Sequence, residues 1–170
     1  EAGVAALYVY HHTGQAAAGY PISFPGLQAT FPAAGDVDGD GALEIVAIGS
    51  GGLVYIFSST GTLERTLTAG SSLTAITAPA LADLDEDGIP EIIVQADRSL
   101  NVWQGDGTIL PGWPEAWGPD YLPGGSAPVV GDVYGDQFQD IVITLEIIDG
   151  EGSGEVRVFN RQAEMHPAFP

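Results

Sequence analysis

A nine-residue acidic segment occurs three times in this chain, at intervals of 47 and 49 residues. The copies, here called acidic loops 1, 2 and 3, cover residues 36–44, 83–91 and 132–140. In loops 1 and 2, aspartate stands at positions 1, 3 and 5, glycine at 6 and glutamate at 9. Repeats about 20 to 50 residues long indicate a series of similar units, each of which buries its apolar face against its neighbours.

The spacing of the acids predicts a metal site in each loop. Carboxylates at positions 1, 3 and 5 and a turn glycine at 6 form a tight loop whose oxygens converge, and the acid at position 9 closes it. Such an arrangement suits a hard cation that prefers oxygen ligands and tolerates variable geometry, which favours calcium.

The EF-hand loop begins with the same residues, but it needs a bidentate glutamate at position 12 and a helix on each side. Position 12 is Ala47, Val94 or Ile143 in the three copies. Short β-branched runs follow each loop, such as residues 44–48, and they lack the 3.6-residue period of a helix. EF-hand and dockerin loops are therefore excluded.

The residues around each acidic loop read as four short strands, with the loop between the first and the second. A proline stands four residues before each loop, and the apolar run follows it. The third strand ends in an aromatic residue, which is Phe57, Trp103 or Phe159, with an earlier copy ending at Tyr10. The fourth strand ends in Gly-aromatic-Pro at residues 19–21 and 112–114 and in the variant Ala168-Phe169-Pro170, whereas the unit around loop 1 lacks this ending.

The second strand of each unit is apolar at consecutive positions, which is typical of a strand covered on both faces. Sheets buried on both faces need a similar sheet on each side, and radial stacking of such sheets gives a β-propeller. We predict an all-β fold of about three and a half four-stranded blades within a larger ring. The predicted units are residues 1–25 (the C-terminal half of a preceding blade), 26–72 and 73–122 (blades with a calcium loop), and 123–170 (a blade with a degenerate loop).

The pattern resembles the FG-GAP repeats, also called VCBS repeats, of integrin alpha propellers and of many secreted bacterial proteins. The resemblance extends over about residues 4–170, and its best-matched unit is residues 78–114. It implies that calcium is bound by the side chains at positions 1, 3, 5 and 9 and by the main-chain carbonyl at position 7. The ligands so implied are Asp36, Asp38, Asp40, Ala42 and Glu44 in loop 1, Asp83, Asp85, Asp87, Ile89 and Glu91 in loop 2, and Asp132, Asp136, Phe138 and Asp140 in loop 3.

Loop 3 departs from this pattern at two positions. Tyr134 replaces the aspartate at position 3, and Gln137 replaces the turn glycine at position 6. Because one carboxylate is missing, we expect loops 1 and 2 to bind calcium and loop 3 to bind it weakly or not at all. His166 reads as an ordinary residue at a strand end.

The charge of the chain limits its partners and its location. It has 23 acidic residues but only four arginines and no lysine, so its net charge is -19. Nucleic acid and anionic membrane surfaces are poor partners for such a charge, so we expect no nucleic-acid partner. The sequence has no run of 18 or more apolar residues, so we expect no membrane insertion by this segment. Acidic loops of this kind fill at millimolar extracellular calcium, so we expect a secreted or cell-surface protein.

No catalytic arrangement is present: the chain has no cysteine, no lysine and no G-x-S-x-G motif, so we expect no enzyme. The leading interpretation is a calcium-stabilised module for binding, adhesion or surface assembly, with a protein or glycan outside the cell, or other segments or copies of the same protein, as partner. One alternative is a lectin-like propeller in which Trp117 and Tyr121, in the irregular segment 115–126, either stack on a sugar or pack over the blade junction. Another is the propeller part of a secreted polysaccharide-degrading enzyme.

Residues 3–24 read as the third and fourth strands of a unit whose first two strands are missing. We therefore expect either an open arc or contacts from another segment or chain at residues 3–24, and we do not expect these residues to pair with the chain's own C-terminal strands.

Overall fold

The computed structural model describes residues 5–24, 26, 31–70, 76–148 and 150–167. Within these residues the fold is all-β, with one short 3-10 helix, η1 (Ser50–Gly52). The strands are β1 (Ala6–Leu7), β2 (Ile22–Ser23), β3 (Ala33–Gly35), β4 (Glu44–Ile48), β5 (Leu53–Phe57), β6 (Leu63–Thr68), β7 (Ala80–Ala82), β8 (Glu91–Ala96), β9 (Ser99–Trp103), β10 (Glu115–Ala116), β11 (Tyr121–Pro123), β12 (Val129–Gly131), β13 (Asp140–Ile147) and β14 (Gly154–Phe159). No helix in the described part of the chain is long and apolar enough to cross a membrane.

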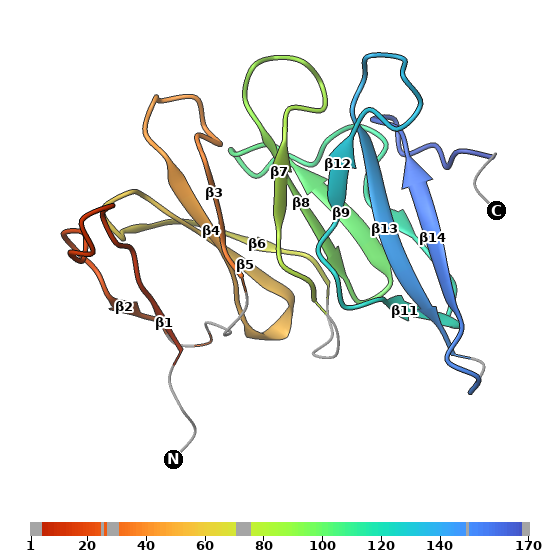
Figure 1. Cartoon of the computed structure of the whole chain (residues 1–170), viewed down its shortest axis with the longest axis horizontal. Helices are drawn as coiled ribbons and strands as arrows, with labels where there is room; N and C mark the ends of the chain where they lie inside the picture. Colours follow the sequence, from red (N-terminus) through yellow and green to blue (C-terminus); the bar gives the residue numbers. More distant parts are fainter. Residues whose placement is uncertain (1–4, 25, 27–30, 71–75, 149, 168–170) are drawn as a thin grey trace.

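Three four-stranded antiparallel sheets follow one another along the chain, side by side (Figure 1). Sheet 1 has the order β3-β4-β5-β6 and sheet 2 the order β7-β8-β9-β10. In sheet 3, β14 pairs along one edge of β13, while β12 and β11 pair with successive parts of the other edge. These two short strands take the place of β3 in sheet 1, and in sheet 2 an isolated bridge between Ile76 and Ala96 likewise extends the edge that β7 occupies. The predicted four-stranded, all-β units are confirmed.

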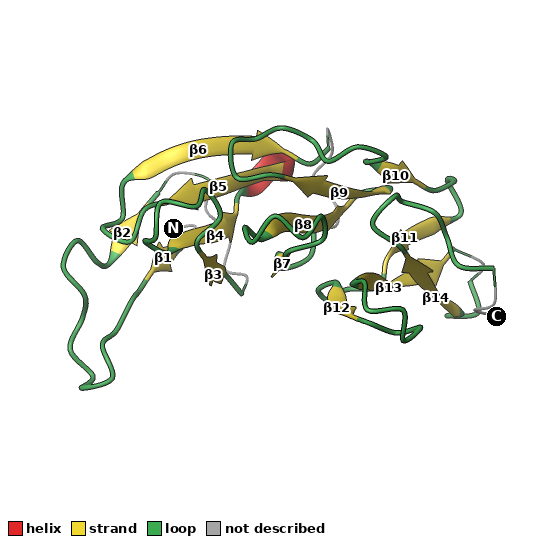
Figure 2. Cartoon of the chain, turned by 90° about the horizontal axis from the view of Figure 1, so that it is seen from above, coloured by secondary structure: helices red, strands yellow, loops and turns green. Residues whose placement is uncertain are grey.

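The array is open in the described residues. The N-terminal hairpin of β1 and β2 pairs only within itself, and it lies at the opposite end of the array from β14 (Figures 1 and 2). No strand pairing joins the hairpin to sheet 3 among these residues, as the open arc requires. The larger ring stays a prediction.

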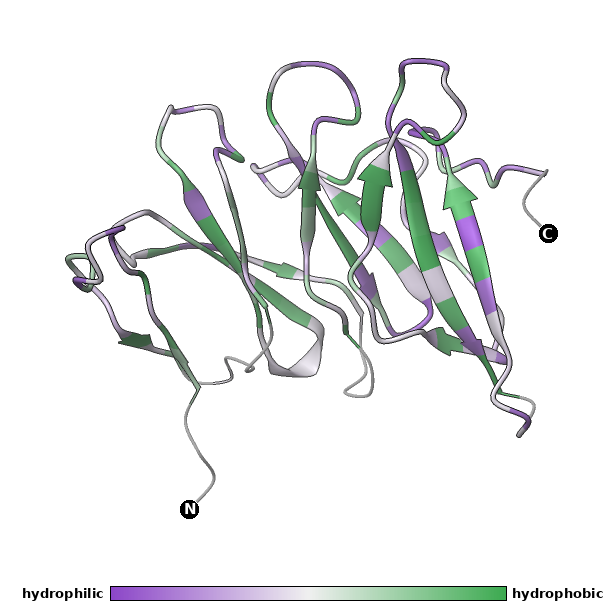
Figure 3. Ribbon diagram, in the orientation of Figure 1, coloured by the Kyte–Doolittle hydropathy of each residue, from purple (hydrophilic) through white to green (hydrophobic). Residues whose placement is uncertain are grey.

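Consecutive apolar residues in the second strands are explained by cores on both sides. Core 1 lies between the N-terminal hairpin and sheet 1, core 2 between sheets 1 and 2, and core 3 between sheets 2 and 3. Ile45 faces the hairpin in core 1, and its neighbour Val46 faces sheet 2 in core 2, because successive side chains of a strand point to opposite faces. Likewise Ile92 faces sheet 1, and Ile93 faces sheet 3 in core 3. Figure 3 accordingly shows hydrophobic stretches along the second strands β4, β8 and β13.

The two Gly-aromatic-Pro endings that the structure describes pack against the next sheet. The Tyr20 hydroxyl donates to the Ser58 carbonyl at 3.2 Å, and the Trp113 Nε1–H donates to the Arg161 carbonyl at 3.2 Å. A Cβ on the preceding Gly112 would lie 2.6 Å from the carbonyl oxygen of the next sheet's turn, so the close approach requires glycine. Both prolines follow cis peptide bonds. The third ending, Ala168-Phe169-Pro170, lies outside the described residues.

Two details differ from the sequence interpretation. The fourth strand of sheet 2 does not run continuously to residue 114: it is an isolated bridge between Trp103 and Ile109, followed by β10. Segment 115–126, expected to be irregular, contains β10 and β11, because short edge strands carry little hydrophobic periodicity. The predicted unit boundaries stay predictions: two of them fall at residues outside the described ranges, and β11 straddles the third, after residue 122.

Candidate metal-binding loops

The three acidic loops connect the first and second strands of their sheets, and all three lie at the same edge of the array (Figure 1). In loop 1 the carboxylates hold the backbone turn. Asp36 Oδ2 accepts a hydrogen bond from the Gly41 N–H at 2.9 Å, and Asp40 Oδ1 accepts one from the Ala42 N–H at 2.7 Å. Short acidic side chains suit this role, because they bond readily to backbone a few residues on.

Loop 2 repeats these contacts. Asp83 Oδ2 accepts from the Gly88 N–H at 3.0 Å, and Asp87 Oδ1 accepts from the Ile89 N–H at 2.8 Å. The turn residue at position 6 has a positive φ in both loops, 89° at Gly41 and 92° at Gly88. That conformation favours glycine.

The acid at position 9 is the first residue of the second strand and is buried in all three loops. Glu91 accepts a hydrogen bond from the Leu84 N–H at 2.7 Å, and Glu44 accepts one from the Val37 N–H at 3.1 Å. Burial, and then the charges of Asp85 and other loop carboxylates, raise the pKa of Glu91 to about 7, although the bond from Leu84 opposes this. Burial raises the pKa of Glu44 as well.

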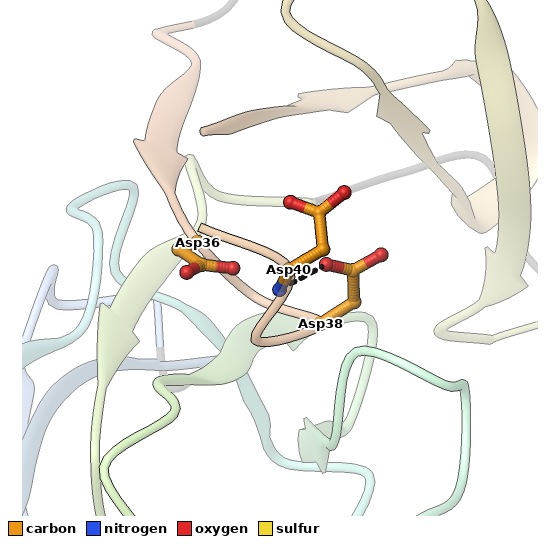
Figure 4. Close-up of side chains that lie close together, drawn as sticks. All are labelled: Asp36, Asp38 and Asp40. Carbon is orange, nitrogen blue, oxygen red and sulfur yellow. Dashed lines mark hydrogen bonds between the residues drawn. The ribbon is translucent and has the colours of Figure 1, made fainter. Parts of the chain in front are cut away.

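Two groups of carboxylates converge. In loop 1, one oxygen each from Asp36, Asp38 and Asp40 lies within 4.8 Å of the others (Figure 4). In loop 2 the corresponding group is Asp83, Asp85 and Glu91. The buried Asp83 Oδ1 has no hydrogen-bond partner among the described residues. Like charges held together and a buried, unpaired carboxylate oxygen both fit a bound cation.

The predicted ligand sets are only partly brought together. Glu44 in loop 1 and Asp87 in loop 2 stand outside the converged groups. Asp87 instead lines a cavity of about 200 Å³ between loops 1 and 2, which Asp38 also lines. That Ala42 and Ile89 offer their carbonyls to an ion stays a prediction.

Loop 3 keeps the backbone turn of the other loops without their carboxylate group. Asp132 Oδ2 accepts from the Gln137 N–H at 3.0 Å, Asp136 Oδ1 from the Phe138 N–H at 3.0 Å, and Asp140 Oδ2 from the Val133 N–H at 2.9 Å. Gln137 takes the turn conformation at a φ of 78°. Loop 3 contributes no group of three converged acids among the described residues.

Two contacts from the C-terminal segment close loop 3, and no sequence pattern indicates them. The Tyr134 ring stacks on the His166 ring, with centroids 3.4 Å apart and an interplanar angle of 13°. The Arg161 guanidinium lies 4.4 Å from the centroid of the Phe138 ring and 3.5 Å from the Glu86 carboxylate of loop 2. His166 lies at a strand end, as expected, because its N–H donates to the Val158 carbonyl at 2.9 Å. Its ring contact with loop 3 was not predicted.

The two aromatic residues offered for sugar binding are engaged in the fold. Trp117 is only 7% exposed and belongs to core 3. Tyr121 packs against the same core, and its ring lies 4.6 Å from the Arg157 guanidinium. Packing over the blade junction is therefore the role that these residues have, and Trp117 is not available to stack on a sugar.

The chain was compared with protein families, curated sequences and solved structures, and the family comparison agrees with the repeat architecture. The model of a family described as FG-GAP-like repeat matches the chain over residues 36–94 and 83–143. A comparison with curated protein sequences found no significant match. Among solved structures, the V. cholerae biofilm matrix protein Bap1 is similar over 89% of this chain, with 20% identity and a TM-score of 0.47, and the match covers 30% of the Bap1 chain. Because the two family matches together span more than half of its residues, the chain belongs to the FG-GAP-like repeat family.

Proposed function

We propose that this chain is a calcium-stabilised β-propeller module that acts outside the cell in binding, adhesion or surface assembly, without catalysis. The observation that carries the proposal is the convergence of three carboxylates in loop 1 and again in loop 2. Within the loop 2 group, the buried Asp83 Oδ1 has no hydrogen-bond partner among the described residues, which also supports a bound cation.

The chemistry of the donors favours calcium over other cations. Both groups offer only carboxylate oxygens, and neither includes a histidine. Zinc prefers nitrogen and sulfur ligands, and magnesium demands a near-ideal octahedron, whereas calcium accepts six to eight oxygens in a flexible geometry. The carbonyls of Ala42 and Ile89 and the carboxylates of Glu44 and Asp87 are the further ligands we propose.

The role we propose for the ions is structural. Each loop holds several like charges in a turn of nine residues, and a divalent cation offsets their repulsion. Since the sites form only in the folded chain, metal binding and folding are coupled. The bound ions would fix the loops along one edge of the array, where a partner could meet them.

Isothermal titration calorimetry with calcium tests the metal sites. We expect two sites per chain in the parent, one site in Asp36→Asn and one in Asp83→Asn. Asp120→Asn is the matched control, because it removes the same charge from a residue outside the loops. Equal binding by all four proteins, or no binding at millimolar calcium, would contradict the calcium sites.

The binding role needs a separate measurement. The labelled chain is applied to immobilised polysaccharides and extracellular proteins with calcium and with a chelator. We expect retention on at least one surface that depends on calcium and is lost in the Asp36→Asn/Asp83→Asn double variant. Calcium binding without retention on any surface would leave a stabilised fold but contradict the adhesive role.

A further inference from the structure

The cavity of about 200 Å³ between loops 1 and 2 is surrounded by carboxylates. Asp38 comes from loop 1, and Asp87 and Glu91 come from loop 2. Asp106 lies in the turn that follows β9. Glu91 is buried, whereas the other three are exposed, so solvent reaches the cavity. No basic residue is among the described residues that line it, and the cavity therefore suits a positively charged group.

Calcium in loops 1 and 2 does not neutralise this region. Each of these loops has four acids at the ligand positions, so one divalent ion leaves each loop about two negative charges. Asp106 belongs to neither group of converged carboxylates. Hydrogen bonds from Thr108, and then the charge of Arg65, lower the pKa of Asp106. Arg65 itself lines a smaller neighbouring cavity of about 80 Å³, together with Glu44 and Glu64.

The junction between loops 2 and 3 shows what the corresponding place holds elsewhere in the chain. Trp103 and Phe159 each form an antiparallel bridge with the residue six positions later. The turn after β9 therefore corresponds to the turn after β14, and Arg161 is the equivalent of Gly105.

Arg161 places a guanidinium group at its junction. This group lies 4.4 Å from the centroid of the Phe138 ring, at position 7 of loop 3, and 3.5 Å from the Glu86 carboxylate of loop 2. At the junction of loops 1 and 2, the residue at position 7 is Ile89, which lines the cavity, and Gly105 has no side chain to place there. The chain thus supplies a guanidinium to one junction and leaves the corresponding space of the other open.

The shape and the walls of the cavity favour an organic cation. A Cβ on Gly105 would clash with the Val37 carbonyl, so this turn packs directly on loop 1 and cannot fill the cavity with a side chain. The volume of about 200 Å³ equals that of roughly six waters at about 30 Å³ each, which is more than a metal ion needs. Val37 and Ile89 give the cavity an apolar wall, and this suits a planar, weakly hydrated guanidinium better than a strongly hydrated ammonium group.

We propose that this cavity binds the guanidinium group of an arginine side chain from a partner protein. The partner's arginine takes the place that Arg161 holds at the next junction, with Asp106 as its main carboxylate partner and Ile89 beside its planar face. The partner is a protein because the guanidinium at the corresponding junction is presented by a protein turn, which the loops accommodate. This contact gives the binding role proposed above a specific chemistry and rests on that role.

NMR titration of the isotope-labelled chain in millimolar calcium tests the proposal, with N-acetyl-arginine-amide as the probe. We expect the amide signals of Gly105 and Ile89 to shift with a dissociation constant of about 1 mM, since a single side chain makes a weak contact. N-acetyl-citrulline-amide has nearly the same shape without the charge and should cause no shift. N-acetyl-lysine-amide should bind at least about threefold more weakly than the arginine probe.

Asp106→Asn separates this site from the calcium sites. Asparagine keeps the oxygen that accepts the Thr108 N–H at 2.7 Å but loses the charge. The variant should bind the arginine probe at least about fivefold more weakly and still bind two calcium ions. Asp120→Asn is the matched control and should behave like the parent, because Asp120 does not line the cavity.

The outcomes distinguish this site from the calcium sites. A parent that binds two calcium ions but not the arginine probe would overturn the arginine site alone. Equal binding of the arginine probe by parent and Asp106→Asn, or equal binding of the lysine and arginine probes, would overturn it as well. Binding of the arginine probe without any calcium binding would contradict the calcium sites and leave the arginine site standing.

Arg161→Gly tests the correspondence of the two junctions. The substitution removes the guanidinium but keeps the residue 161 carbonyl that accepts the Trp113 Nε1–H at 3.2 Å. The arginine probe should then bind at a second place and shift the Phe138 amide signal, which it leaves unchanged in the parent. Shifts confined to the cavity between loops 1 and 2 would overturn the correspondence and, with it, the proposal.

Discussion

Loops 2 and 3 have nearly the same backbone but differ in what holds them. In both, the acids at positions 1, 5 and 9 accept hydrogen bonds from the N–H groups at positions 6, 7 and 2. At position 3, loop 2 has Asp85 in a group of converged carboxylates, while loop 3 has Tyr134 stacked on His166. The turn therefore does not require a particular residue at position 3, which joins a carboxylate group in one loop and makes an aromatic contact in the other.

The largest expected effect is that of removing calcium. A ligand that binds only the folded state stabilises it by about 2.7 kcal/mol per site at a concentration of 100 Kd, so chelation should lower the melting temperature markedly and added calcium should restore it. Differential scanning calorimetry measures this. An unchanged melting temperature would contradict the proposal that calcium stabilises the fold through loops 1 and 2.

The next effect separates loops 2 and 3 directly. Asp85→Ala removes a carboxylate from a converged group, and because ligand charge sets affinity, it should weaken one calcium site about tenfold or more. Tyr134→Ala should leave calcium affinity unchanged. Titration calorimetry of both variants decides the matter, and equal affinities in parent and variants would show that these loops are not the sites.

Loop 2 should also respond to pH through Glu91. Its pKa of about 7 in the folded, metal-free chain lies above its ordinary value of 4.5, chiefly because of burial. A raised pKa means that the folded state holds the proton more tightly, so this stabilisation is present below pH 4.5 and is lost as pH rises to about 7. The contribution of the raised Glu91 pKa to the free energy of unfolding is about 1 to 3 kcal/mol at low pH.

The affinity for calcium should depend on pH in the opposite sense, because calcium binds the ionised form of the Glu91 carboxylate. Its affinity for loop 2 should rise as pH increases from about 5.5 to about 8. Glu91→Gln is the control, since it cannot titrate. Metal-free melting temperatures and calcium titrations across this range measure both effects, and a dependence on pH that survives in Glu91→Gln would assign it to other groups.

Loop 3 can be tested by substitutions that should give it a calcium site like those expected in loops 1 and 2. Tyr134→Asp restores a carboxylate at position 3 of a turn that already has the right backbone, so it should raise the calcium stoichiometry from two to three. The Tyr134→Asp/Gln137→Gly variant also restores the turn glycine, where Gln137 now adopts a positive φ. Three calcium ions bound by the parent, or two bound by both variants, would contradict this reading of position 3.

The sequence predicted much of this fold, because its main signals are local. The loops, the buried second strands and the aromatic strand ends lie at fixed spacings within each unit, and periodicity and turn chemistry report them directly. Contacts between segments that are distant in the sequence could not be predicted. The stacking of His166 on Tyr134 joins residues with no shared pattern, and the short strands β10 and β11 are set by the neighbouring strand they pair with.

The smallest expected effect concerns the stack that closes loop 3. His166→Ala removes one ring of the pair and should cost about 0.5 to 1.5 kcal/mol in unfolding free energy, the range for aromatic pairs, while calcium stoichiometry stays at two. Tyr134→Phe is the matched control. It keeps the ring and removes a buried hydroxyl that has no hydrogen-bond partner among the described residues, so it should be neutral or slightly stabilising. If Tyr134→Phe destabilised the chain as much as His166→Ala, the hydroxyl rather than the ring would be what loop 3 needs.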